Sequence, residues 1–142
     1  MRMYARAIVI VGILTASMLA AAPQGAKIPS QAAAFLGTWT VTMTAPDEMK
    51  GDKVTVRIWD KNGSVAASIQ TRQEGPVIEA TGVLLDADML IFTVSHQGKP
   101  PMRENGAPIW ATFTLTLDGD SLKLAQTLER SETIKRGVGR RQ

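Results

Sequence analysis

Residues 38–44 read Thr-Trp-Thr-Val-Thr-Met-Thr. This strict alternation places Trp39, Val41 and Met43 on one face and four threonines on the other, which is typical of a β-strand buried on one side only. Residues 109–117 repeat the pattern as Ile-Trp-Ala-Thr-Phe-Thr-Leu-Thr-Leu. Two such stretches, far apart in the chain, predict an all-β fold.

The sequence around these two stretches divides into short alternating segments separated by turn signals. The turns include Asp60-Lys61-Asn62-Gly63 and Asp118-Gly119-Asp120, whose residue types favour tight hairpins. The predicted strands are residues 38–44, 53–59, 64–71, 77–85, 89–95, 109–117, 121–128 and 131–137. Residues 77–85 are partly apolar on both faces, so the sequence does not decide which face of this strand is buried. Residues 96–108 contain three prolines and are expected to form one long loop.

The strand count and the short connections predict the architecture. No segment suits a helix long enough for a crossover, so neighbouring strands are expected to run antiparallel. An open sheet of eight strands would leave two unpaired edges, whereas a closed sheet pairs them. We therefore predict a single antiparallel up-and-down barrel of about eight strands, with a two-sheet sandwich as the alternative.

The N-terminal segment predicts export. Arg2 and Arg6 precede an apolar run, residues 7–22, that ends in three alanines and is followed by a proline. This order is typical of a cleavable signal peptide, and an uncleaved membrane anchor is the alternative. The expected segments are the signal peptide at 1–22, a linker at 23–34, the barrel at 35–137 and a basic C-terminal tail at 138–142. The predicted location is the periplasm or the extracellular space of a bacterium.

Composition excludes several function classes. The chain has no cysteine, so disulfides, zinc–thiolate sites and cysteine nucleophiles are excluded. Of its 16 lysines and arginines, two lie in the predicted signal peptide, which leaves fourteen basic against 13 acidic residues. A nucleic-acid-binding surface would need a basic stripe with interleaved aromatics, so no nucleic-acid partner is expected. A single histidine, His96, permits no histidine metal cluster, and neither a metal nor a cofactor is expected.

The start of the first strand resembles a known family. Residues 35–39, Phe-Leu-Gly-Thr-Trp, are similar to the Gly-x-Trp opening of lipocalin-like, or calycin, barrels. The glycines Gly63 and Gly82, together with segments 88–94 and 113–120, resemble the small lipocalin-like domains of secreted bacterial proteins. The resemblance covers residues 35–137. Classical lipocalins also have a disulfide, a long opening loop and a helix after the last strand, which this chain lacks.

The resemblance implies a role for Trp39. In that family the opening tryptophan packs at the closed end of the barrel against a basic residue of the last strand, which Arg136 or Lys135 would supply. A closed barrel of this size has room for side chains or for one small ligand. The first functional hypothesis is therefore a secreted protein that binds a small apolar or amphipathic molecule inside the barrel. The expected ligand-binding residues are Val41, Met43, Val56, Ile58, Ile69, Leu90, Phe92, Phe113 and Leu124.

Two further hypotheses belong to other classes. The chain could be a non-catalytic module that binds a protein of the cell envelope, through the long loop or through Trp59 and Trp110, which alternate against the apolar stripes of their strands. It could also be an enzyme of the cyclase or isomerase type, with His96, Arg103 and Glu104 as acid–base candidates. Because no nucleophile motif accompanies these three residues, the sequence favours a non-catalytic protein without a stable membrane anchor once the signal is removed.

Overall fold

The computed structural model describes residues 28–96, 109–129 and 131–142. Its elements are α1 Ser30–Ala33, β1 Gly37–Ala45, a 3-10 turn Asp47–Met49, β2 Lys53–Lys61, β3 Ser64–Gln70, β4 Ile78–Glu79, β5 Gly82–Asp86, β6 Met89–His96, β7 Ile109–Asp118, β8 Ser121–Leu128 and β9 Ile134–Arg141. The predicted signal peptide, and the predicted loop from residue 97 onward, lie outside the described residues.

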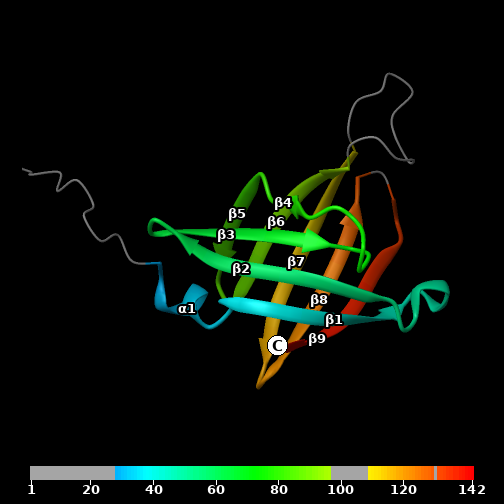
Figure 1. Cartoon of the computed structure of the whole chain (residues 1–142), viewed down its shortest axis with the longest axis horizontal. Coiled ribbons are helices and arrows are strands. Elements are labelled where there is room, and N and C mark those ends of the chain that lie inside the picture. Colours follow the sequence, from blue (N-terminus) through cyan, green and yellow to red (C-terminus); the bar gives the residue numbers. More distant parts are fainter. Residues whose placement is uncertain (1–27, 97–108, 130) are drawn as a thin grey trace, which may run out of the picture.

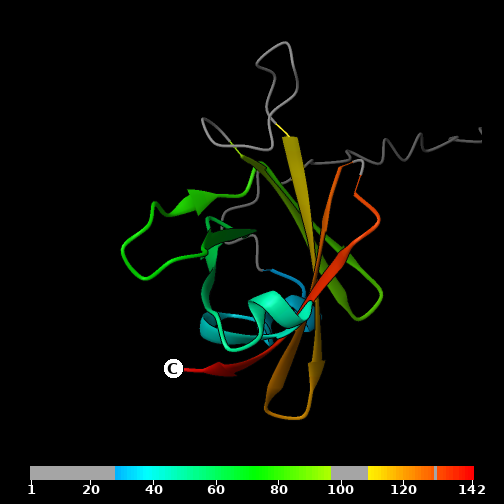
Figure 2. The same ribbon diagram turned by 90° about the vertical axis from the view of Figure 1, so that its right-hand side faces the viewer.

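The strands form one antiparallel sheet in the order β4-β3-β2-β1-β9-β8-β7-β6-β5. Neighbouring strands are consecutive in the sequence except at the centre, where β1 pairs with β9, and the consecutive strands β4 and β5 lie at opposite edges. The first and last strands of the up-and-down meander therefore pair with each other at the centre of the sheet. The two edge strands are β4 and β5. The sheet curls into a half-barrel in which β1, β2 and β3 cross over β6, β7 and β8 (Figures 1 and 2). The predicted all-β, up-and-down fold is confirmed, and one continuous sheet takes the place of the two-sheet alternative.

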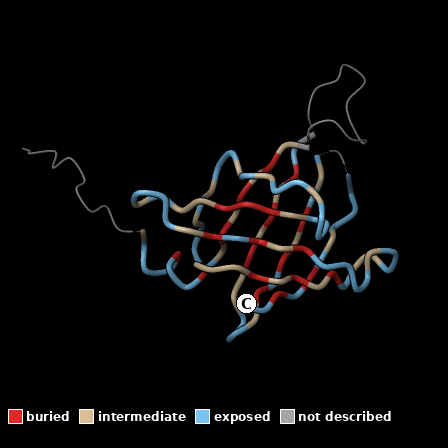
Figure 3. Tube along the Cα trace, in the orientation of Figure 1, coloured by how far each residue is buried: buried red, intermediate tan, exposed pale blue. Residues whose placement is uncertain are grey.

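The core lies on the concave side of this sheet. Buried residues alternate along the crossing strands, as Figure 3 shows. In β1 the inward side chains are Trp39, Val41 and Met43, while Thr40 and Thr42 face outward. Phe92 of β6 and Phe113 of β7 stack with ring centroids 5.1 Å apart. The period-two pattern thus places the apolar residues where the prediction puts them, because each strand buries a single face.

The predicted strand at residues 77–85 is broken into β4 and β5. The amide of Ala80 donates to Ala67 of β3, whereas the amide of Thr81 donates to Thr93 of β6. The chain therefore leaves one edge of the sheet and joins the other within two residues. The break also exchanges the buried face, since Ile78 and Ala80 pack on the core before it and Val83 and Leu85 pack on the core after it. This exchange explains why neither face of the segment looked uniformly apolar.

The boundaries predicted for the barrel near the N-terminus and the C-terminus were wrong. The last strand runs from Ile134 to Arg141, so residues 138–141 belong to a central strand and do not form a tail. The inward positions of β9 include Gly137 and Gly139, and a strand whose inward residues are glycines shows no apolar stripe. At the other end the fold includes α1, where Ala32 is buried, although residues 23–34 were predicted as a linker.

Candidate functional site

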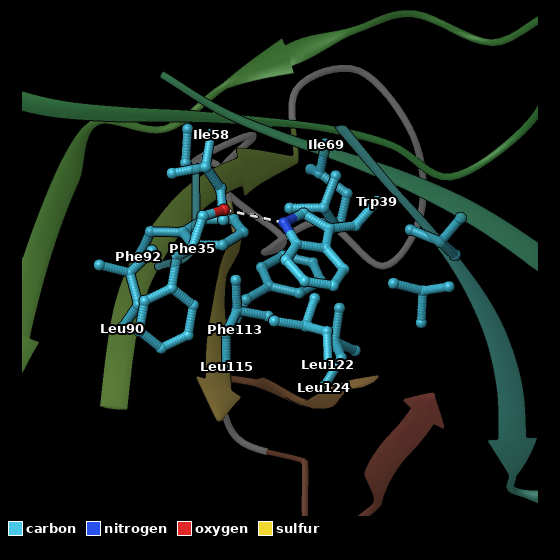
Figure 4. Close-up of a cluster of buried hydrophobic side chains, with 14 of the residues drawn as sticks. Phe35, Trp39, Ile58, Ile69, Leu90, Phe92, Phe113, Leu115, Leu122 and Leu124 are labelled. Carbon is cyan, nitrogen blue, oxygen red and sulfur yellow. Dashed lines mark hydrogen bonds between the residues drawn. The ribbon is translucent and has the colours of Figure 1, made fainter. Parts of the chain in front are cut away.

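Trp39 closes one end of the half-barrel. Its ring is 1% exposed, and its Nε1 donates a hydrogen bond of 2.8 Å to the carbonyl of Phe35 (Figure 4). The Arg141 guanidinium lies over the ring, with Cζ 4.5 Å from the ring centroid. The same guanidinium donates from Nη1 to Leu36 O at 2.5 Å and from Nη2 to Ala34 O at 2.8 Å. One arginine thus covers the tryptophan and holds the segment that leads into β1.

The arginine of this closed end is Arg141, so the prediction of Arg136 or Lys135 was wrong. In the β1–β9 ladder Trp39 is opposite Arg141, whereas Arg136 is opposite Ala45 at the far end of β1. The two strands are antiparallel, so the start of β1 can meet only the end of β9. Because the sequence prediction ended the last strand at residue 137, its nearest basic residues lay at the wrong end.

The Arg141 contact predicts a measurable loss of stability. We expect Arg141→Ala to lower the free energy of unfolding by about 1.5 kcal/mol, since it removes two charge-assisted hydrogen bonds and a stacked cation at an exposed site. Arg140→Ala removes an arginine side chain from the outer face of the same strand, and should change the free energy of unfolding by less than about 0.5 kcal/mol. Urea denaturation measures both, and equal losses in the two variants would contradict the assigned role.

The nine predicted ligand-binding residues all lie in the core, with exposed fractions of 0–3%. Figure 4 shows how closely many of them lie to Trp39 and Phe35. A side chain that lined a hollow wide enough for a water molecule would keep accessible area toward it. These nine side chains therefore contact one another and their core neighbours, so a ligand that touched them would first have to displace part of the core. Their role as ligand contacts stays a prediction.

Several of the partly buried apolar side chains lie where the chain passes from one edge of the sheet to the other. We call this region the seam; it consists of Val65 of β3, Ile78 of β4, Val83 and Leu85 of β5, and Ala80 between β4 and β5. All five pack against the core without being fully covered. The strands on either side, β3 and β5, contact each other. Next to the seam, Val77 and Leu84 are 63% and 61% exposed.

A second surface feature lies beside the closed end. An open depression of about 510 Å³ is lined by Ala34, Trp39, Leu117, Gly119, Asp120, Arg140 and Arg141. Carboxylate and guanidinium groups share its rim, so its chemistry suits a polar group more than the apolar ligand that the sequence predicts.

The remaining predicted site residues are spread over the chain. Arg103 and Glu104 lie outside the described residues, and for His96 only the backbone, at the end of β6, is described. The structure therefore leaves these acid–base candidates as a prediction. Trp110 faces outward and is 40% exposed, and Trp59 is half-buried on the outer face with the Arg57 guanidinium 5.0 Å from its ring centroid.

Fold and closed end together define an antiparallel half-barrel sealed by an arginine-covered tryptophan. Neither a protein-family model nor a curated protein nor a solved structure matches this chain. In the described ranges, no helix has the length and apolar character needed to cross a membrane.

Proposed function

We propose that this chain is an exported, non-catalytic barrel of the calycin type that binds a small apolar or amphipathic molecule at the seam. The calycin assignment is supported by the Gly37-Thr38-Trp39 opening and by the placement of Arg141 over Trp39. Export to the periplasm or the extracellular space is supported by the basic and apolar N-terminal sequence. Mass spectrometry of the protein that cells accumulate tests export, since cleavage near residue 22 removes the apolar run.

The observation that carries the binding proposal is the contrast between the core and the seam. The side chains deep in the core leave no accessible area, whereas the seam side chains are apolar, in contact with the core and still partly accessible. A molecule at the seam would cover them without first displacing the core. If it buried roughly 250 Å² of apolar surface, it would gain about 6 kcal/mol, equivalent to a Kd of tens of micromolar before the costs of association.

Binding of N-phenyl-1-naphthylamine tests the proposal, because the fluorescence of this probe rises in apolar surroundings. We expect saturable binding to the wild-type protein and a Kd about five- to tenfold higher for Leu85→Ser, which removes apolar area from the seam. Leu84→Ser is the matched control: it changes the adjacent residue of β5, which points outward, and should alter the Kd less than twofold. Absence of saturable binding, or equal losses in the two variants, would rule the seam out.

One observation favours a second candidate, the envelope-protein interaction module. Trp110 is an outward-facing tryptophan with 40% of its surface exposed, and exposed aromatics are enriched at protein interfaces. This candidate predicts that Trp110→Ala abolishes capture of a specific envelope protein while probe binding at the seam is unchanged.

A further inference from the structure

The outer face of β9 combines exposed aliphatic and basic residues. Along this strand Ile134, Arg136, Val138 and Arg140 face outward, and the two aliphatic side chains are 44% and 40% exposed. Because β9 lies between β1 and β8, these residues are at the middle of the sheet and not at its edge. Single exposed aliphatic side chains are common on protein surfaces, but here each of them lies beside an arginine on the same face of the strand.

Four cationic side chains surround Val138. Arg136 and Arg140 precede and follow it by two residues on the same face of β9. On one side Val138 is opposite Lys123 of β8. On the other side it is opposite Thr42 of β1, whose hydroxyl accepts a hydrogen bond of 2.6 Å from Lys53 Nζ. We call Val138 and the four cationic side chains, Arg136, Arg140, Lys123 and Lys53, the basic patch.

The strands that carry the centre of this patch contain no carboxylate. β1, β8 and β9 include neither aspartate nor glutamate. Two acidic side chains lie at its margin. Asp118, at the end of β7, lies 3.3 Å from Lys123 Nζ, with both groups more than half exposed, and Asp120 lines the same depression as Arg140. An exposed pair of this kind contributes little. The patch therefore keeps a local excess of positive charge, in a chain whose mature part is nearly neutral.

The mixture of side chains indicates the kind of partner. At a lipid surface, aliphatic side chains enter the boundary between headgroups and acyl chains while lysines and arginines contact the headgroup phosphates. A nucleic acid would attract the same cations, but exposed Ile134 and Val138 offer it no stacking surface. We propose that the basic patch docks this protein on a negatively charged lipid surface. This interaction is separate from ligand binding at the seam, which lies on other strands.

Co-sedimentation with vesicles tests the docking surface, using the purified protein in the form that cells accumulate. The vesicles contain 30% phosphatidylglycerol in phosphatidylcholine, or phosphatidylcholine alone. We expect binding only to the anionic vesicles, decreasing as salt is added. The double variant Arg136→Gln/Arg140→Gln should bind about 25-fold more weakly, since each cation near such a surface accounts for about a fivefold change. Val138→Ser should cost about threefold through lost insertion.

A matched double variant distinguishes the patch from overall charge. Lys61→Gln/Arg72→Gln removes two positive charges from exposed positions elsewhere, and should retain anionic-vesicle binding within about threefold. Equal losses in both double variants, or equal binding to the neutral vesicles, would overturn the proposal. The proposal would also be overturned if the protein bound duplex DNA more tightly than the anionic vesicles and Arg136→Gln/Arg140→Gln abolished the DNA binding. All changed side chains are exposed or half-exposed, and circular dichroism checks that each variant is folded.

Discussion

Replacing Trp39 with alanine should lower the free energy of unfolding by about 4 kcal/mol and the Tm by roughly 15 °C. The indole is among the largest fully buried side chains of the described residues. Its removal leaves a cavity at the closed end and takes the donor away from the carbonyl of Phe35. It also removes the surface on which Arg141 lies. Urea and thermal denaturation followed by circular dichroism measure the loss.

A second variant at Trp39 and a control at Trp59 separate the contributions of the indole ring, its N–H group and its burial. Trp39→Phe keeps an aromatic ring but lacks the N–H group, so it should cost about 2 kcal/mol, through the unpaired carbonyl and the smaller ring. Trp59→Ala makes the same change on the outer face of β2, where the side chain is half-buried, and should cost about 1 kcal/mol. If Trp39→Ala were no more damaging than Trp59→Ala, the closed end would not depend on its tryptophan.

Replacing Gly137 with valine should destabilise the protein by about 3 kcal/mol. A Cβ atom at this position would lie 2.6 Å from Val41 Cγ1 and 3.0 Å from both Met43 Sδ and the backbone oxygen of Thr42. Side chains can move slightly, but a backbone oxygen in the middle of the sheet cannot move without disturbing the β1–β9 ladder. The cost should therefore appear as a lower midpoint in urea with little change in slope.

The matched control is Gly82→Val in β5. A Cβ at Gly82 meets no atom within 4 Å, and valine favours strands, so stability should stay equal or rise by a few tenths of a kcal/mol. A double-mutant cycle provides a second check. Val41→Ala removes the atom that a new Cβ meets first, so the losses from Gly137→Ala and Val41→Ala should sum to more than the loss in the double variant. Strict additivity would show that the two positions do not touch.

The positions of most strands and the side of each that is buried follow from the sequence alone. Alternation in residues 38–44 and 109–117 depends only on the backbone geometry of a strand, which turns successive side chains to opposite faces. The nine side chains expected to face inward are all buried for this reason. Turn residues such as those of Asp60-Lys61-Asn62-Gly63 likewise act locally, and Asn62 and Gly63 both adopt positive φ there.

The tertiary structure alone decided how these strands meet. Trp39 is covered by Arg141, and by neither Arg136 nor Lys135. This depends on the register of two strands at opposite ends of the chain. Gly137 and Gly139 face the core, and this depends on how closely β9 approaches Val41. An inward glycine produces no hydrophobic pattern that the sequence could reveal. The seam arises because Ala80 and Thr81 bond to opposite edges of the sheet. Periodicity is a property of one segment, whereas register, close approach and strand breaks are set by a neighbour that lies far away in the sequence, as Arg141 does from Trp39.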